Sequence, residues 1–147
     1  MINMLRTSRL SRLGALLLIA LLGSGFSYLG TASATVAAAA ASVDFQTISS
    51  QDLVQMLPHK DFVLVNVHIP YEGEIAKTDV FIPFDQIAAN LDKLPSDKTA
   101  HIVLYCRSGR MSEIAATTLA NLGYTHVDHL VGGMIGWEAA GERLLHN

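Results

Sequence analysis

The sequence has little cysteine and little charge, and each shortage excludes a class of protein. Cys106 is the only cysteine in 147 residues, so no disulfide framework can hold the chain together. Only 16% of the residues are charged, below the roughly 25% of typical soluble domains. The net charge of −3 disfavours a nucleic-acid binder. Because 50% of the residues are hydrophobic, a disordered chain is also excluded. There remain a compact globular domain, a membrane protein, or a small domain with an apolar appendage.

The apolar excess lies mainly at the N-terminus. Residues 1–41 contain three arginines and no acidic residue, with an unbroken apolar or glycine run from Leu13 to Leu22 and an Ala-x-Ala pattern at 32–34. A basic start, a short apolar core and small residues are typical of a secretory signal peptide. We therefore expect residues 1–41 to be a signal peptide with an Ala-rich linker, or an uncleaved membrane anchor. Residues 42–147 are then an exported domain, periplasmic or anchored to the membrane facing the periplasm.

Strand-like and helix-like segments alternate along this domain. Runs of β-branched and apolar residues predict strands, two of them buried on both faces as in a parallel sheet. Apolar spacing of three and four residues predicts the helices, and Gly123 stands where a C-terminal glycine cap is expected. This alternation predicts an α/β fold with a mostly parallel sheet. The expected strands are 45–48, 62–67, 80–82, 101–105 and 126–130, and the expected helices are 52–57, 85–94, 111–122 and 133–140.

Residues 105–112, Tyr-Cys-Arg-Ser-Gly-Arg-Met-Ser, carry the strongest chemical signal. They join an expected buried strand to an expected helix, which in open α/β sheets is where ligands bind. Backbone N–H groups at a helix start, together with Arg107 and Arg110, favour an anion and stabilise a thiolate. Gly109 permits a backbone conformation that other residues resist. The sequence therefore predicts that Cys106 is an anionic nucleophile that needs no separate general base.

From about Phe45 to Leu144 the chain resembles a single-domain rhodanese. The loop and helix start at 106–112 resemble the family's active-site loop, and Gly132-Gly133 with Trp137 resembles its glycine-pair and tryptophan segment. Residues 64–68 lie where the family has a strand ending in Asp-x-Arg. The resemblance implies a three-layer fold, with a central, mostly parallel five-stranded sheet and helices on both faces.

The resemblance also implies an activity, that of a thiosulfate sulfurtransferase. Cys106 would take a sulfane sulfur from thiosulfate, a persulfide or a polysulfide, and would pass it from a persulfide to cyanide or a thiol. The expected partners are a small anionic donor, a thiophilic acceptor and a sulfur-relay protein, without nucleic acid, and no metal or cofactor is expected. The expected substrate-binding residues are the rest of the loop: Arg107, Ser108, Gly109, Arg110, Met111 and Ser112.

Two segments depart from the family pattern. Asn66-Val67-His68 replaces Asp-x-Arg, which removes an expected charged pair. Residues 70–79 replace the family's Gly-His-Ile-Pro-Gly-Ala with a longer stretch containing Glu72 and Glu74. This stretch is either a divergent surface loop or, near the rim of the site, the mark of a changed acceptor or docking partner.

The sequence leaves three alternatives to sulfur transfer. A phosphatase or arsenate reductase of the Cys-x5-Arg type needs an arginine six positions after the cysteine, where this chain has Ser112. A non-enzymatic sulfur carrier or docking module would use the same fold, and stays open. A metal pair at His126 and His129 is disfavoured, because residues three apart on a strand face opposite sides.

Overall fold

The computed structural model describes residues 44–146, so the segment expected to direct export, residues 1–41, lies outside the described residues. The main sheet has five strands in the order β1-β6-β5-β2-β4, and each neighbouring pair is parallel. The strands are β1 (Gln46–Ile48), β2 (Val63–Asn66), β4 (Val80–Phe81), β5 (Ile102–Tyr105) and β6 (Val127–Leu130). This sheet confirms the α/β class and the parallel topology that the sequence predicts.

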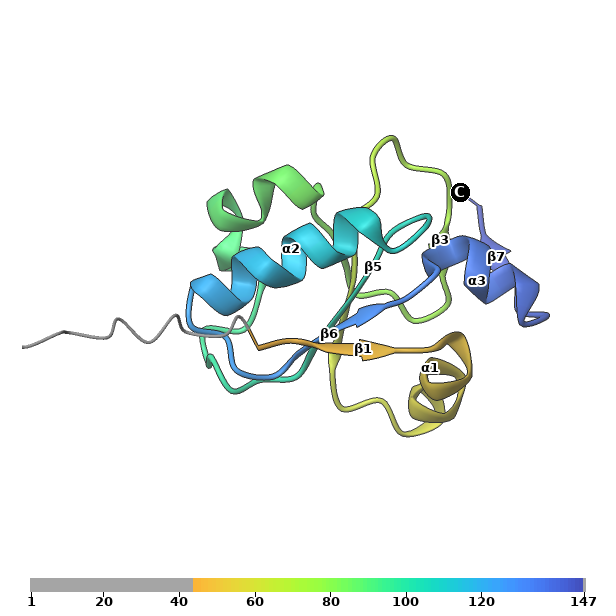
Figure 1. Cartoon of the computed structure of the whole chain (residues 1–147), viewed down its shortest axis with the longest axis horizontal. Helices are drawn as coiled ribbons and strands as arrows, with labels where there is room; N and C mark the ends of the chain where they lie inside the picture. The colour runs from red at the N-terminus through yellow and green to blue at the C-terminus, as the bar shows by residue number, and fades with distance from the viewer. Residues whose placement is uncertain (1–43, 147) are drawn as a thin grey trace, which may run out of the picture. The chain divides into compact units, whose positions relative to one another are not determined.

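Helices cover both faces of the sheet, which gives three layers (Figure 1). Alternate residues of β5 enter two different cores. Ile102 and Leu104 pack with the helix α2, whereas Val103 and Tyr105 pack with α1 and α3. The α-helices are α1 (Ser50–Met56), α2 (Arg110–Asn121) and α3 (Gly133–Ala139), and the 3-10 turns are η1 (Leu57–His59), η2 (Phe84–Ala89) and η3 (Leu91–Lys93). Between residues 44 and 146, none of the helices has the length and apolar character needed to cross a membrane.

Local signals set the ends of the α-helices. Ser49 and Asp52 form a reciprocal capping box at the start of α1, in which each side chain accepts the other residue's backbone N–H. Helix α2 begins after Gly109, whose φ of 96° lies in the left-handed region. Gly123, with φ of 88°, follows the end of this helix, as the expected glycine cap requires.

Residues 85–94 do not form the α-helix that their apolar spacing predicts. The structure has η2 and η3 instead, held by i to i+3 hydrogen bonds such as Asn90 N–H to the Ile87 carbonyl at 3.1 Å. Asn90 interrupts them, because its φ of −125° and ψ of 33° lie outside the helical region. Ile87 still reaches the core, so the apolar pattern reports burial correctly but not the helix type.

The segment at 69–79 is more ordered than the expected loop. It contains β3 (Glu74–Ile75), which pairs antiparallel with β7 (Leu144–Leu145) in a second, two-stranded sheet. The hydroxyl of Tyr105 on the central strand accepts the Ile75 N–H at 3.0 Å and lies 2.7 Å from Thr78 Oγ1. Burial raises the pKa of Tyr105 to about 12, so the hydroxyl remains a neutral hydrogen-bonding group at neutral pH. The segment is therefore tied to the main sheet.

Candidate active site

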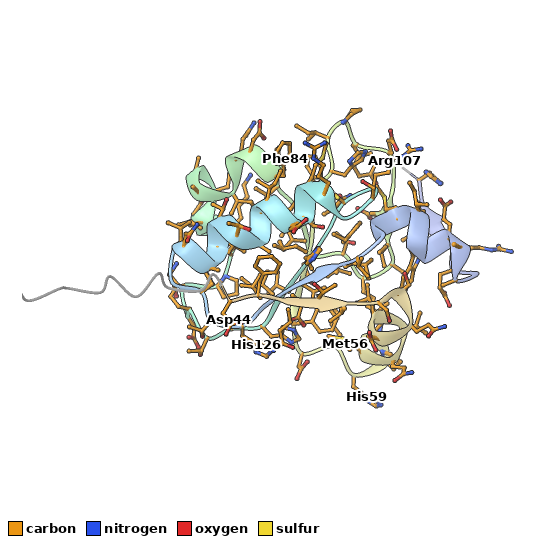
Figure 2. The ribbon with its side chains drawn as sticks, in the orientation of Figure 1. Asp44, Met56, His59, Phe84, Arg107 and His126 are labelled. Carbon is orange, nitrogen blue, oxygen red and sulfur yellow. The ribbon has the colours of Figure 1, made fainter. Side chains whose placement is uncertain are left out.

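Cys106 directly follows β5, at the carboxyl edge of the parallel sheet. Residues 107–109 turn the chain, and α2 starts at Arg110. Figure 2 shows Arg107 near this edge, far from Asp44 at the other end of the domain. The carboxyl edge of a parallel sheet is where the ends of strands and the starts of helices converge, so the topology places the predicted loop where a ligand site is expected.

Cys106 is almost completely buried, and its own loop contacts the sulfur. The residue is 1% exposed, and the Gly109 N–H donates to Sγ at 3.1 Å. Gly109 itself has a left-handed backbone, with φ of 96°, so the chain can turn from this bond into α2. A backbone donor aimed at the sulfur stabilises negative charge there, both on a thiolate and on a group attached to it.

A chain of polar contacts braces this loop against the edge of the sheet. Ser112 Oγ donates to the Gly109 carbonyl at 2.8 Å and lies 3.5 Å from His129 Nδ1 on β6. His129 Nε2 in turn lies 3.2 Å from Thr47 Oγ1 on β1. Burial lowers the pKa of His129, which favours the neutral imidazole in this contact. From the sequence alone His129 suggested only a metal ligand, because its link to the loop depends on how α2 packs against β6.

The start of α3 donates hydrogen bonds to the backbone of the cysteine loop. Met134 N–H donates to the Cys106 carbonyl at 2.9 Å, and Ile135 N–H donates to the Arg107 carbonyl at 3.0 Å. Gly133 makes this approach possible, because a Cβ at its position would lie 2.1 Å from the Cys106 carbonyl oxygen. The glycine pair recognised in the sequence therefore has a specific structural role, which is to seat a helix on the carbonyl groups of the loop.

The remaining predicted substrate-binding residues divide into two groups. Arg107, Ser108 and Arg110 are exposed, so these side chains are accessible to an incoming molecule. Ser112 is buried under the loop, and Met111 is half-buried against the core beneath α2. In this structure Met111 and Ser112 therefore support the site from within, whereas the two arginines supply charge at its surface.

A carboxylate from the atypical segment meets the first of these arginines. The Glu72 side chain forms an ion pair with the Arg107 guanidinium, and this hydrogen bond lowers the pKa of Glu72. His68 Nε2 lies 3.5 Å from the same Glu72 oxygen. His68 is 5% exposed, and neither ring nitrogen makes a hydrogen bond to the described residues. The segment at 70–79 therefore reaches the rim of the site.

Asn66 holds this carboxylate segment in position. Its Nδ2 donates to the Gly73 carbonyl at 3.0 Å, and its Oδ1 accepts the His68 N–H at 3.0 Å. A carboxylate at position 66 could accept the second bond but could not donate the first. The departure from the family's Asp-x-Arg thus replaces the expected charged pair with an amide that binds the chain next to Glu72.

A small cavity of about 170 Å³ lies beside Arg107. Its wall combines charged and apolar side chains from the 70–79 segment, the cysteine loop, α3 and the C-terminal residues: Glu72, Arg107, Met134, Ile135, Glu138, Leu144 and His146. In the described part of the chain, no group of three or more His, Cys, Asp or Glu side chains is arranged to hold a metal ion. His126 instead stacks on His101, with ring centroids 3.8 Å apart.

Most of the described domain matches a known protein family. A family model described as a rhodanese-like domain matches residues 49–140. A sulfurtransferase of Allochromatium vinosum is 34% identical over 99 residues, covering 64% of this chain and 89% of that protein. A tRNA uridine(34) hydroxylase of Hamiltonella defensa is 30% identical over 96 residues, covering 61% of this chain but only 27% of that longer protein.

The fold has matching solved structures as well. A rhodanese-related protein from Thermoplasma volcanium superposes with a TM-score of 0.59 at 24% identity, covering 68% of this chain and 97% of that one. The parallel sheet, the cysteine loop at its carboxyl edge and the family match over most of the described domain agree with one another. The chain belongs to the rhodanese-like sulfurtransferase family.

Proposed function

We propose that this protein transfers a sulfane sulfur through a persulfide on Cys106. The observation that carries the proposal is the hydrogen bond from the Gly109 N–H to Sγ, at the carboxyl edge of the sheet. A nucleophilic sulfur that receives a backbone donor can form a covalent intermediate whose negative charge is already stabilised. Two exposed guanidinium groups lie on this loop, that of Arg110 and that of Arg107, which is paired with Glu72.

The reaction consists of two displacements. The Cys106 thiolate attacks the outer sulfur of thiosulfate, the S–S bond of the donor breaks, and its electron pair leaves with sulfite. The new persulfide is then attacked at its outer sulfur by cyanide or a thiolate, and the electron pair of the broken bond returns to Cys106 as a thiolate. Because the cysteine is 1% exposed, a donor with a terminal sulfur atom fits this reaction better than a donor with a bulky reacting group.

The geometry does not favour a phosphatase or arsenate reductase. Those reactions need a cation six positions after the cysteine to grip an oxyanion. Ser112 occupies that position, is buried, and donates to the Gly109 carbonyl. This hydroxyl therefore supports the loop and does not point at a substrate.

The test is sulfur loading followed by intact-mass measurement. After treatment with thiosulfate, the protein should gain one sulfur atom, and Cys106→Ser should gain none. Because Cys106 is the only cysteine, any adduct on that variant reports non-specific chemistry. If neither thiosulfate nor a persulfide or polysulfide loads the wild-type protein, sulfur transfer is refuted. Multiple turnover with cyanide or small thiols distinguishes an enzyme from a sulfur carrier, since a carrier loads once and does not cycle with small acceptors.

A further inference from the structure

The rim beside Cys106 carries charges of both signs. Arg107 is the residue after the cysteine, and its backbone is fixed because its carbonyl accepts the Ile135 N–H at 3.0 Å. Its guanidinium pairs with Glu72, and the two side chains are 54% and 37% exposed. An incoming sulfur donor therefore meets an arginine whose charge is already balanced by a carboxylate.

The carboxylate is held at this place by the fold. Asn66 binds the carbonyl of Gly73, the next residue, and Glu74 pairs with Leu145 in the small sheet. Nε2 of the buried His68 ring lies 3.5 Å from the Glu72 oxygen that pairs with Arg107. Asn66 Oδ1 also accepts the His68 N–H at 3.0 Å, so the backbone is held both before and after Glu72. Because exposed ion pairs contribute little to stability, fold maintenance is a weak reason for this pairing.

The pairing has a larger effect on an incoming anion. A lone arginine beside the cysteine would attract thiosulfate, a dianion, whereas the Arg107–Glu72 pair has no net charge. Removing one carboxylate charge within several ångströms of a dianion should raise its capture about threefold to tenfold at moderate ionic strength. A donor that carries an ammonium group should gain little, or should lose, from the same change.

We propose that Glu72 is a specificity-determining residue, which shifts the preference of the Cys106 site from dianionic thiosulfate towards persulfide donors that carry an ammonium group. This inference rests on the proposed sulfur transfer and specifies its donor. With a persulfide R–S–SH, the Cys106 thiolate attacks the outer sulfur and forms an S–S bond. The S–S bond of the donor breaks, its electron pair leaves as the thiolate R–S⁻, and the proton stays on the transferred sulfur.

The experiment compares two donors with cyanide as the common acceptor. kcat/KM is measured for thiosulfate and for cysteine persulfide, which bears an ammonium group, in the wild-type protein, Glu72→Gln and Glu138→Gln. Glu138 is the matched control, because it lines the same cavity, while among the described residues no ion pair joins it to Arg107. A ratio of two donors in one protein sample cancels any loss of folded protein.

The thiosulfate-to-persulfide ratio of kcat/KM should rise at least threefold in Glu72→Gln and should stay within twofold of wild type in Glu138→Gln. The rate with thiosulfate should also fall more steeply with added salt in Glu72→Gln, because the site then has an unbalanced positive charge. An unchanged ratio in Glu72→Gln, or an equal rise in both variants, overturns the role of Glu72 while leaving sulfur transfer intact. Failure of both donors on the wild-type protein overturns the proposed function, and this inference with it.

Discussion

Replacing Gly133 with alanine should separate α3 from the cysteine loop. The residue has a φ of 54°, and an added Cβ would lie 2.1 Å from the Cys106 carbonyl oxygen and 2.7 Å from the Arg107 carbonyl carbon. All these neighbours are backbone atoms, so no side chain can rotate away to relieve the clash. The start of α3 must then move, and the bonds from Met134 N–H and Ile135 N–H to the loop carbonyls lengthen or break.

The expected loss in the free energy of unfolding is the sum of two contributions. Each lost backbone hydrogen bond costs about 1 kcal/mol, and the left-handed conformation costs alanine roughly 1 kcal/mol. The free energy of unfolding should therefore fall by about 3 kcal/mol in Gly133→Ala. Gly123→Ala is the matched control, because Gly123 also has a positive φ, 88°, and no neighbour within 4 Å of an added Cβ. That variant should lose only the conformational part, about 1 kcal/mol.

The assay is urea unfolding at pH 7, paired with sulfur loading measured below the unfolding transition. Gly133→Ala should unfold at a clearly lower urea concentration than Gly123→Ala. It should also load less sulfur while still folded, because the carbonyl groups beside Cys106 have lost their donors. If the two variants lose the same stability, within about 0.5 kcal/mol, the proposed seating of α3 on the loop is wrong.

Two further predictions concern buried polar groups near the same segment. Asn66→Asp should lower the free energy of unfolding by at least about 2 kcal/mol, because a buried carboxylate cannot donate to the Gly73 carbonyl; urea unfolding measures this, and unchanged stability would contradict it. The pKa of Tyr105 is about 12, above its ordinary value of 10.0. An unfolded tyrosine therefore releases its proton first, so stability should fall by about 2 kcal/mol as pH rises from 10 to 12. Unfolding curves across that window should show the fall, and Tyr105→Phe should remove it.

The sequence predicts the five main strands and the cysteine loop because their signals are local. A strand buried on both faces, such as β5, needs a short run of apolar and β-branched residues, and 101–105 supplies it. A lone cysteine between that strand and a helix, followed by two arginines within four residues, is an equally local signal. The spacing of Gly132, Gly133 and Trp137 is equally local, although only the structure shows why Gly133 must lack a side chain.

Contacts between distant segments could not be predicted in this way. The Arg107–Glu72 pair joins positions 35 apart in the sequence, and β3 and β7 have two residues each, too few for a periodic signal. Asn66 looked like the loss of a charge, whereas the structure shows a gain of a hydrogen-bond donor. The turns at 84–93 were expected as one helix, because apolar spacing records which side chains are buried more faithfully than how the backbone is bonded.

Because the five main strands are parallel, the start of β1 and the cysteine loop lie at opposite ends of the sheet. The chain enters β1 at the edge opposite Cys106, and Figure 2 shows Asp44 and Arg107 correspondingly far apart. The last strand, β7, instead pairs with β3, close to Glu72. A tag or fusion partner attached before residue 44 would therefore leave the cysteine loop accessible to the proposed sulfur donors and acceptors. A tag attached after β7 would begin close to Glu72 and Arg107, where it would hinder the approach of donors and acceptors to the cysteine loop.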